Sequence, residues 1–216
     1  AEWRPWSPVF TTICEAPCGP GLSYGNQLIY PQPILSDIEF DTDGDMLIGL
    51  MDRLGHQTGE VNYSTSAATT SFNFYDFTTG YTITPVTITA GSTFEGASAG
   101  DILRVCNVAG TFVLENNATC GGITTGGAGS APAQGPGGGE YYWQDMYAVS
   151  GNLNSGTHNE VTLGGLALMP GADEIAGSVF DPFDIRSGGV AWFSNLTGAR
   201  TRAFELFPRT DNASLF

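Results

Sequence analysis

The sequence contains no lysine, so all seven of its basic residues are arginines. They face 22 acidic residues, which leaves a formal net charge of −15 at neutral pH. A surface of this sign repels nucleic-acid phosphates and does not dock electrostatically on anionic membranes. The missing lysine also excludes isopeptide cross-links and Schiff-base chemistry. We therefore expect no nucleic-acid partner, and an acidic surface suited to divalent cations or basic partners.

Long apolar runs and helical patterns are also missing. No stretch approaches the length of a membrane span, so we expect no direct membrane insertion. The first residues lack the basic and apolar regions of an export signal, and if the chain is exported we expect that signal to have been removed. Apolar residues do not recur with helical spacing, whereas short alternating or β-branched runs between turn residues do. Together with 30 glycines, this pattern predicts an all-β fold.

Cysteine is scarce but informative. The four cysteines allow three connectivities, of which we favour Cys14–Cys18 and Cys106–Cys120. Neither pair has the usual zinc-ligand spacing, and both histidines are distant in sequence, which disfavours a zinc site. Disulfides indicate a secreted or cell-surface protein. Four sequons agree with that location and are candidate glycosylation sites: Asn62, Asn117, Asn195 and Asn212.

Two hairpins stand out. Residues 34–53 place the turn Asp41-Thr-Asp43-Gly-Asp45 between two apolar runs, where glycine supplies a positive φ and aspartate caps the backbone. Residues 101–106 and 111–115 form a second pair. Further strand-like runs follow from 141 to 207 at intervals of roughly 8–12 residues, a spacing typical of sandwiches, barrels and propellers.

We expect one domain over residues 1–216 that contains two long insertions. Residues 57–100 are rich in Thr and Ser, and alternating aromatics there predict a hairpin. It either packs on its own domain or exposes an edge that pairs with a neighbouring molecule. Residues 121–139 are nearly all small residues and proline, which predicts a loop.

Several motifs resemble the propeller-like region of large bacterial surface proteins that carry serine-aspartate-repeat B-like domains. The resemblance covers most of the chain and is carried by Tyr30–Arg53, Gly100–Cys106, Gly137–Trp143, His158–Ala167 and Gly188–Asn195. It implies an extracellular or cell-surface position and no particular reaction. It also implies β-propeller-like antiparallel blades, here too few to close a ring, with a β-sandwich as the alternative fold.

The turn after the first strand offers a candidate metal site. Asp41, Asp43 and Asp45, with Asp52 nearby, place several hard oxygen ligands within a few residues, as Ca²⁺ requires. The loop lacks the full EF-hand pattern, and a hairpin turn with solvated carboxylates is the alternative. No cofactor is required by this reading, and Ca²⁺ is an accessory.

These observations predict a non-catalytic extracellular protein with a structural or adhesive role. It would assemble with copies of itself, as fibres or a surface matrix, or with other surface proteins and glycans. A carbohydrate-binding propeller is the alternative, and a secreted hydrolase is a more distant one. The hydrolase would need carboxylates that converge in a pocket, which no local motif shows.

Overall fold

The fold was analysed in a computed structural model of the 216-residue chain. The structure describes residues 3, 5–6, 18–21, 27–28, 32–58, 62–63, 70–76, 82–88, 93–96, 100–129, 135–145, 160, 162–180 and 188–207. The chain divides into two compact units. Unit 1 comprises residues 1–2, 34–51 and 99–213, and unit 2 comprises 3–33, 52–98 and 214–216.

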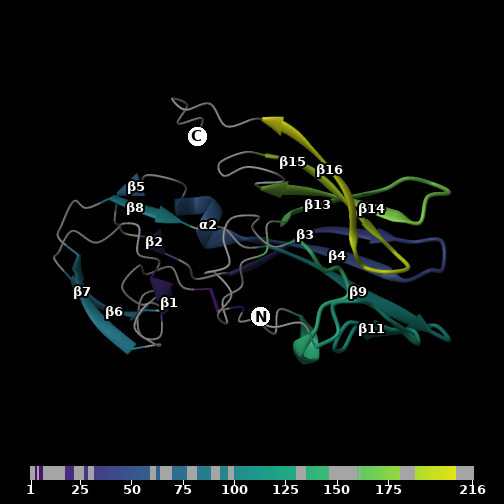
Figure 1. The fold of residues 1–216 in the computed structure, drawn as a ribbon, viewed down its shortest axis with the longest axis horizontal. Coiled ribbons are helices and arrows are strands. Elements are labelled where there is room, and N and C mark those ends of the chain that lie inside the picture. Colours follow the sequence, from purple (N-terminus) through teal and green to yellow (C-terminus); the bar gives the residue numbers. More distant parts are fainter. Residues whose placement is uncertain are drawn as a thin grey trace. The chain divides into compact units, whose positions relative to one another are not determined.

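The described residues form an all-β structure with little helix (Figure 1). Unit 2 contains a sheet ordered β1-β6-β7, a sheet ordered β2-β8-β5 and the short helix α2. Its elements are β1 (Cys18–Gly21), β2 (Gln27–Leu28), α2 (Arg53–Thr58), β5 (Asn62–Tyr63), β6 (Thr70–Asp76), β7 (Thr82–Ile88) and β8 (Thr93–Gly96). The segment 57–100 thus contains an antiparallel hairpin, β6–β7, as expected, together with two further strands.

The first large sheet of unit 1 is built from the two predicted hairpins. Its order is β10-β9-β4-β3, with strands β3 (Pro33–Phe40), β4 (Met46–Asp52), β9 (Asp101–Val108) and β10 (Thr111–Leu114). Gly44 adopts a φ of 81° in the β3–β4 turn, which confirms the role expected of this glycine. The β9–β10 turn lies at residues 109–110, where the second hairpin was expected to reverse.

The second large sheet is an antiparallel meander, β13-β14-β15-β16. Its strands are β13 (Thr162–Leu168), β14 (Glu174–Phe180), β15 (Gly188–Ser194) and β16 (Arg200–Phe207). In β14, buried residues alternate strictly with partly exposed ones, so Ile175, Gly177 and Val179 face the interior. The apolar runs between residues 162 and 207 therefore become strands, as predicted.

The core of unit 1 lies between the two four-stranded sheets. One apolar cluster joins Leu47 and Ile102 of the first sheet to Ile175, Val179 and Phe193 of the second. Polar contacts also cross between the sheets. Ser36 Oγ lies 2.9 Å from the carbonyl oxygen of Gly164, and Leu166 N donates to Asp37 Oδ2 at 2.9 Å.

The all-β class is therefore confirmed and the two sheets share one apolar core, while the β-sandwich stays a prediction. A ring of blades is not seen among the described residues, so the propeller stays a prediction. The glycine-rich stretch is mainly irregular where it is described, with the small hairpin β11 (Thr119–Cys120) and β12 (Ile123–Thr124) and the 3₁₀ turn η1 (Pro136–Gly138). The residues 141–143, expected to be strand-like, form bends with one isolated bridge at Trp143. No described helix is long and apolar enough to cross a membrane.

Candidate functional site

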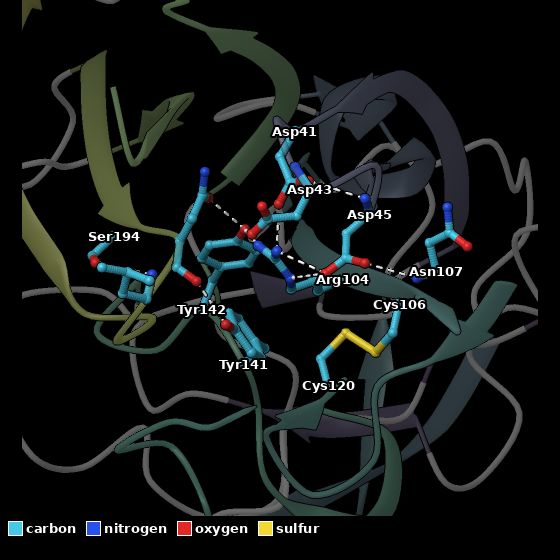
Figure 2. A network of polar contacts seen from close by, with 12 residues as sticks. Asp41, Asp43, Asp45, Arg104, Cys106, Asn107, Cys120, Tyr141, Tyr142 and Ser194 are labelled. Carbon is cyan, nitrogen blue, oxygen red and sulfur yellow. Dashed lines mark hydrogen bonds and ion pairs between the residues drawn. A yellow bond between two sulfur atoms is a disulfide. The ribbon is translucent and has the colours of Figure 1, made fainter. Parts of the chain in front are cut away.

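Arg104, in the middle of β9, is buried and holds the aspartates of the β3–β4 turn (Figure 2). Its Nε and Nη2 atoms donate to Asp45 Oδ2 at 3.0 and 2.8 Å, and Nη2 also donates to Asp41 Oδ2. The Asp41 and Asp45 side chains are 5% and 15% exposed. One guanidinium therefore binds two carboxylates that are largely removed from water.

The same guanidinium reaches the tyrosine pair of the later loop. Arg104 Nη1 donates to Tyr142 Oη at 3.0 Å, and the guanidinium lies 5.0 Å from the centre of the Tyr141 ring. Tyr142 Oη donates in turn to Asn195 Oδ1 at 2.8 Å. The two tyrosine rings meet edge to face, with centroids 5.2 Å apart. Arg104 thus joins the first sheet to the loops beside the second.

Glu115 follows β10 and is buried at 1% exposure. Its Oε1 accepts a hydrogen bond from Arg104 N at 2.9 Å, and its Oε2 accepts one from Tyr141 N at 2.6 Å. Burial raises the pKa of Glu115 to about 8, although these two backbone donors act in the opposite direction. The carboxyl group fastens the Tyr141 loop to β9.

A second buried cluster contains only acidic groups. One oxygen atom from each of Asp101, Glu140 and Glu160 lies within 4.8 Å of those of the other two residues, and all three residues are at most 3% exposed. They come from the start of β9, the loop after η1 and the residue two before β13. Three carboxylates at this separation match the oxygen-rich donor set that hard divalent cations select.

Close backbone packing brings these segments together. Gly100 N donates to the carbonyl oxygen of Glu160 at 3.4 Å. A Cβ atom at position 100 would lie 1.9 Å from the carbonyl oxygen of Thr162 and 2.6 Å from that of Leu50. Only glycine permits this approach. The residue before Asp101 therefore fixes the start of β9 against the segment that carries Glu160.

Asp145 adds a fourth buried carboxylate near the cluster. It is fully buried, and neither of its carboxylate oxygens makes a hydrogen bond to another described residue. Burial raises the pKa of Asp145 to about 7, while Arg200 acts to lower it. Glu140 Oε1 is likewise buried without a hydrogen-bond partner among the described residues.

Electrostatic repulsion reinforces the effect of burial in the cluster. Burial raises the pKa of Glu140 well above its usual range, and the negative charges of Asp145 and Asp101 raise it further. Burial also raises the pKa of Glu160, with Asp101 and Glu140 as the next contributions. Burial and mutual repulsion therefore both favour the protonated form of these carboxyl groups.

The structure places the aspartates of the predicted calcium turn in different roles. Asp41 Oδ1 accepts hydrogen bonds from Asp43 N and Asp45 N at 2.9 Å, which closes the turn. Asp43 is exposed, and Asp41 and Asp45 share Arg104. Asp52 is buried in unit 2, where its Oδ1 accepts from Gln32 N and Leu54 N and so caps α2. Calcium binding at this turn stays a prediction.

The disulfide Cys106–Cys120 is present and joins β9 to β11. Cys14 and the side chain of Cys18 lie outside the described residues, as do Asn212 and the side chain of Asn62. Of the other sequons, Asn117 is exposed, whereas Asn195 is 8% exposed and hydrogen-bonded to Tyr142. In the folded chain Asn195 is thus an interior hydrogen-bonding residue.

Sequence reasoning missed Asp101, Glu140 and Glu160. Each stands singly in its segment, so no local spacing marks the three as a set. A weak signal exists at Gly100-Asp101 and at Gly139-Glu140, where an acidic residue directly follows a glycine near an apolar run. Such pairs are also common in ordinary turns.

Comparison with known proteins finds no matching family model and no matching solved structure. Among curated proteins, colossin-A of Dictyostelium discoideum is 30% identical over 189 residues, which cover 85% of this chain and 1% of colossin-A. Colossin-B of the same organism is 28% identical over 173 residues, which cover 78% of this chain and 4% of colossin-B. These relatives do not bear on the resemblance to bacterial surface proteins. The chain is therefore similar to a short segment of each of two far longer proteins.

Proposed function

We propose that this chain is a non-catalytic structural module of an extracellular protein. The observation that carries the proposal is the burial of its converging acidic groups away from solvent. Asp101, Glu140 and Glu160 form a group of three converging carboxyl groups among the described residues, and they are at most 3% exposed, so a substrate cannot contact them. A buried polar cluster of this kind contributes to structure rather than to turnover.

The similarity to colossins supports a modular role. Most of this chain aligns with a very small part of colossin-A, as expected for one domain within a long chain. The Cys106–Cys120 disulfide supports an oxidising, extracellular setting. Under this proposal, unit 1 is one part of a larger propeller-like architecture of the kind that the resemblance to bacterial surface proteins implies.

The proposal includes self-association through sheet edges, with a second copy of this chain as the partner. β16 forms one edge of its sheet, and Phe204 and Leu206 on it are 59% and 53% exposed. β3 and β10 form the edges of the other sheet, and they expose Leu35, Phe40 and Phe112. Among the described residues these strands pair on one side only, and edges with exposed apolar side chains favour pairing with another strand.

Sedimentation velocity over a concentration series tests this assembly. We expect dimers or longer species to accumulate as the concentration rises to the millimolar range, and Phe204→Lys to shift the equilibrium towards monomer. Glu205→Gln, on the same strand, is the matched control because it also raises the net charge by one. A strictly monomeric wild type at every concentration would refute self-association, and turnover of glycoside or ester substrates would refute the non-catalytic role.

Carbohydrate binding is a second candidate because of one surface feature. Trp192 lines a shallow, mainly apolar hollow of about 340 Å³ together with Met169, Pro170 and Glu174. Arg202 stacks over the Trp192 ring at 4.7 Å and pairs with Glu174, so a sugar would stack on the other face of the ring. Glycan-array binding that is lost in Trp192→Ala and kept in Trp143→Phe would favour this candidate.

A further inference from the structure

The acidic cluster of unit 1 brings several carboxyl groups together in a buried place. The largest electrostatic effects on Glu140 and Glu160 come from other carboxylates, among them Asp101 and Asp145. Arg104 is already engaged with Asp41 and Asp45. Buried carboxylates are normally paired, protonated or bound to a metal.

Two orphaned groups point to a missing ligand. Glu140 Oε1 is buried and lacks a hydrogen-bond partner among the described residues. The Glu140 carboxylate converges with those of Asp101 and Glu160. Asp145 lies close enough to act electrostatically on Glu140 and Glu160, and both of its oxygens are buried without such a partner. An unsatisfied buried carboxylate oxygen is costly unless a cation or a proton compensates it.

We propose that Asp101, Glu140 and Glu160 bind a structural Ca²⁺ ion inside unit 1. The donor set is entirely oxygen, which selects against zinc and other metals that prefer nitrogen or sulfur. Three carboxylates can supply up to six oxygens, within the range of six to eight that Ca²⁺ takes. Mg²⁺ retains several waters and fits an enclosed carboxylate cage less well.

The ion would join three segments that are distant in sequence. Asp101 opens β9, Glu140 lies in the loop that leads to the buried tyrosine pair, and Glu160 precedes β13. A cation shared among them ties the first sheet to the loop and to the second sheet. This role differs from that of the exposed Asp43 in the predicted calcium turn.

The first test uses the full oxidised chain, unfolded in urea with a calcium chelator and refolded without metal. Thermal unfolding is then followed with and without Ca²⁺ at about 100 times its dissociation constant, obtained by calorimetric titration. We expect the melting temperature to rise by about 5 to 10 °C, and by much less with an equal concentration of Mg²⁺. An unchanged melting temperature and no calcium binding would overturn the proposal, because the carboxyls would then be sharing protons alone.

Variants locate the ion. Glu160→Gln keeps the shape of the side chain and is expected to lose most of the calcium-dependent shift. Asp43→Asn, in the exposed turn, is the matched control and should keep it. If Glu160→Gln does not fold, Glu140→Gln serves as the second ligand variant. Equal shifts in the ligand variant and the control would overturn the assignment, as would loss of the shift in Asp43→Asn.

Terbium gives a local readout. Tb³⁺ takes oxygen ligands like Ca²⁺, and Tyr141, Tyr142 and Trp143 directly follow Glu140 in the sequence. Excitation of these aromatic residues should sensitise Tb³⁺ emission at one equivalent, and Ca²⁺ should displace it. Sensitised emission that survives in Glu160→Gln would place the ion elsewhere and refute the site. Because these tests measure metal binding alone, their failure would leave the structural role and self-association open to their own tests.

Discussion

Two buried polar clusters of unit 1 differ in how their charges are compensated, although both include a residue of β9. Around Arg104, one cation meets two aspartates and a tyrosine hydroxyl within hydrogen-bonding distance. Around Asp101, three carboxylates converge, with a fourth nearby. In the first cluster, both aspartates bind the same cation. In the second, like charges lie close together, which favours protonation or a bound cation, so we expect the stability of unit 1 to depend on pH and on metal ions.

The largest expected effect is the pH dependence of the metal-free protein. The pKa values of Glu115 and Asp145 rise from 4.5 to about 8 and from 3.8 to about 7 on folding. The folded state thus binds more protons than the unfolded state, and the extra stability is complete below about pH 4 and is lost as the pH rises through 7 and 8. At about 1.4 kcal/mol per pKa unit, the two shifts together correspond to a loss on the order of 9 kcal/mol.

Urea denaturation in a chelating buffer, repeated from pH 4 to pH 8, measures this loss. The groups that act on Glu115 include Asp101 and Arg104, and Arg200 acts on Asp145. Added Ca²⁺ should flatten the profile, because the cation replaces protons as the compensating charge. A metal-free stability that is constant or rises across this range would contradict the contrast between the two clusters.

Removing the cation of the first cluster should have the next largest effect. Arg104→Met keeps much of the apolar volume but leaves Asp41 and Asp45 without their partner and Tyr142 without a donor to its hydroxyl. Breaking a buried ion pair from one side costs about 3 to 5 kcal/mol. Chemical denaturation at constant pH measures this loss. A loss below about 1 kcal/mol would show that the Arg104 cluster does not hold unit 1 together.

Glu115 joins β9 to the loop that contains Tyr141, and its replacement should have an intermediate effect. In Glu115→Gln, one of the two carboxylate acceptors becomes an amide donor that faces a backbone N–H of Arg104 or Tyr141. Leaving a buried donor unsatisfied costs about 1 to 3 kcal/mol. Amide hydrogen exchange should show faster exchange at whichever backbone N–H loses its partner. Unchanged exchange at both positions would exclude the bridging role.

A surface ion pair provides the smallest effect and the reference for the others. Arg202 Nη2 lies 2.8 Å from Glu174 Oε2, and their side chains are 52% and 23% exposed. Arg202→Met should therefore change the free energy of unfolding by less than about 1 kcal/mol, and the change should shrink in high salt. A loss as large as that of Arg104→Met would mean that burial does not distinguish the two arginines.

Local patterns predicted much of the fold. The turn at Asp41–Asp45 and the reversal before residue 111 were expected because glycine and aspartate favour turns within a few residues of each other. The Cys106–Cys120 disulfide was likewise favoured from cysteines that are close in sequence. The consecutive tyrosines 141 and 142 were read as a strand, yet both are fully buried, which an irregular loop allows and a half-exposed strand does not.

The site could not be predicted in the same way. Arg104 reaches Asp45 and Asp41 across 59 and 63 residues, and nothing in the turn itself indicates that a guanidinium lies against it. The turn therefore looked like a free set of calcium ligands. Asp101 and Glu160 likewise belong to no local sequence motif. They converge because the backbone packs closely at Gly100.

The sequence by itself determined that this protein folds from extended strands and turns, and that its acids outnumber its bases. Alternation of apolar residues and the position of turn residues act over a few residues, so they are readable without a structure. Only the tertiary structure decided which acids meet Arg104 and which are buried together without it. The reason is that the free-energy cost of burying a charge depends on the polar and charged groups that surround it. Those groups come from segments far apart in the sequence.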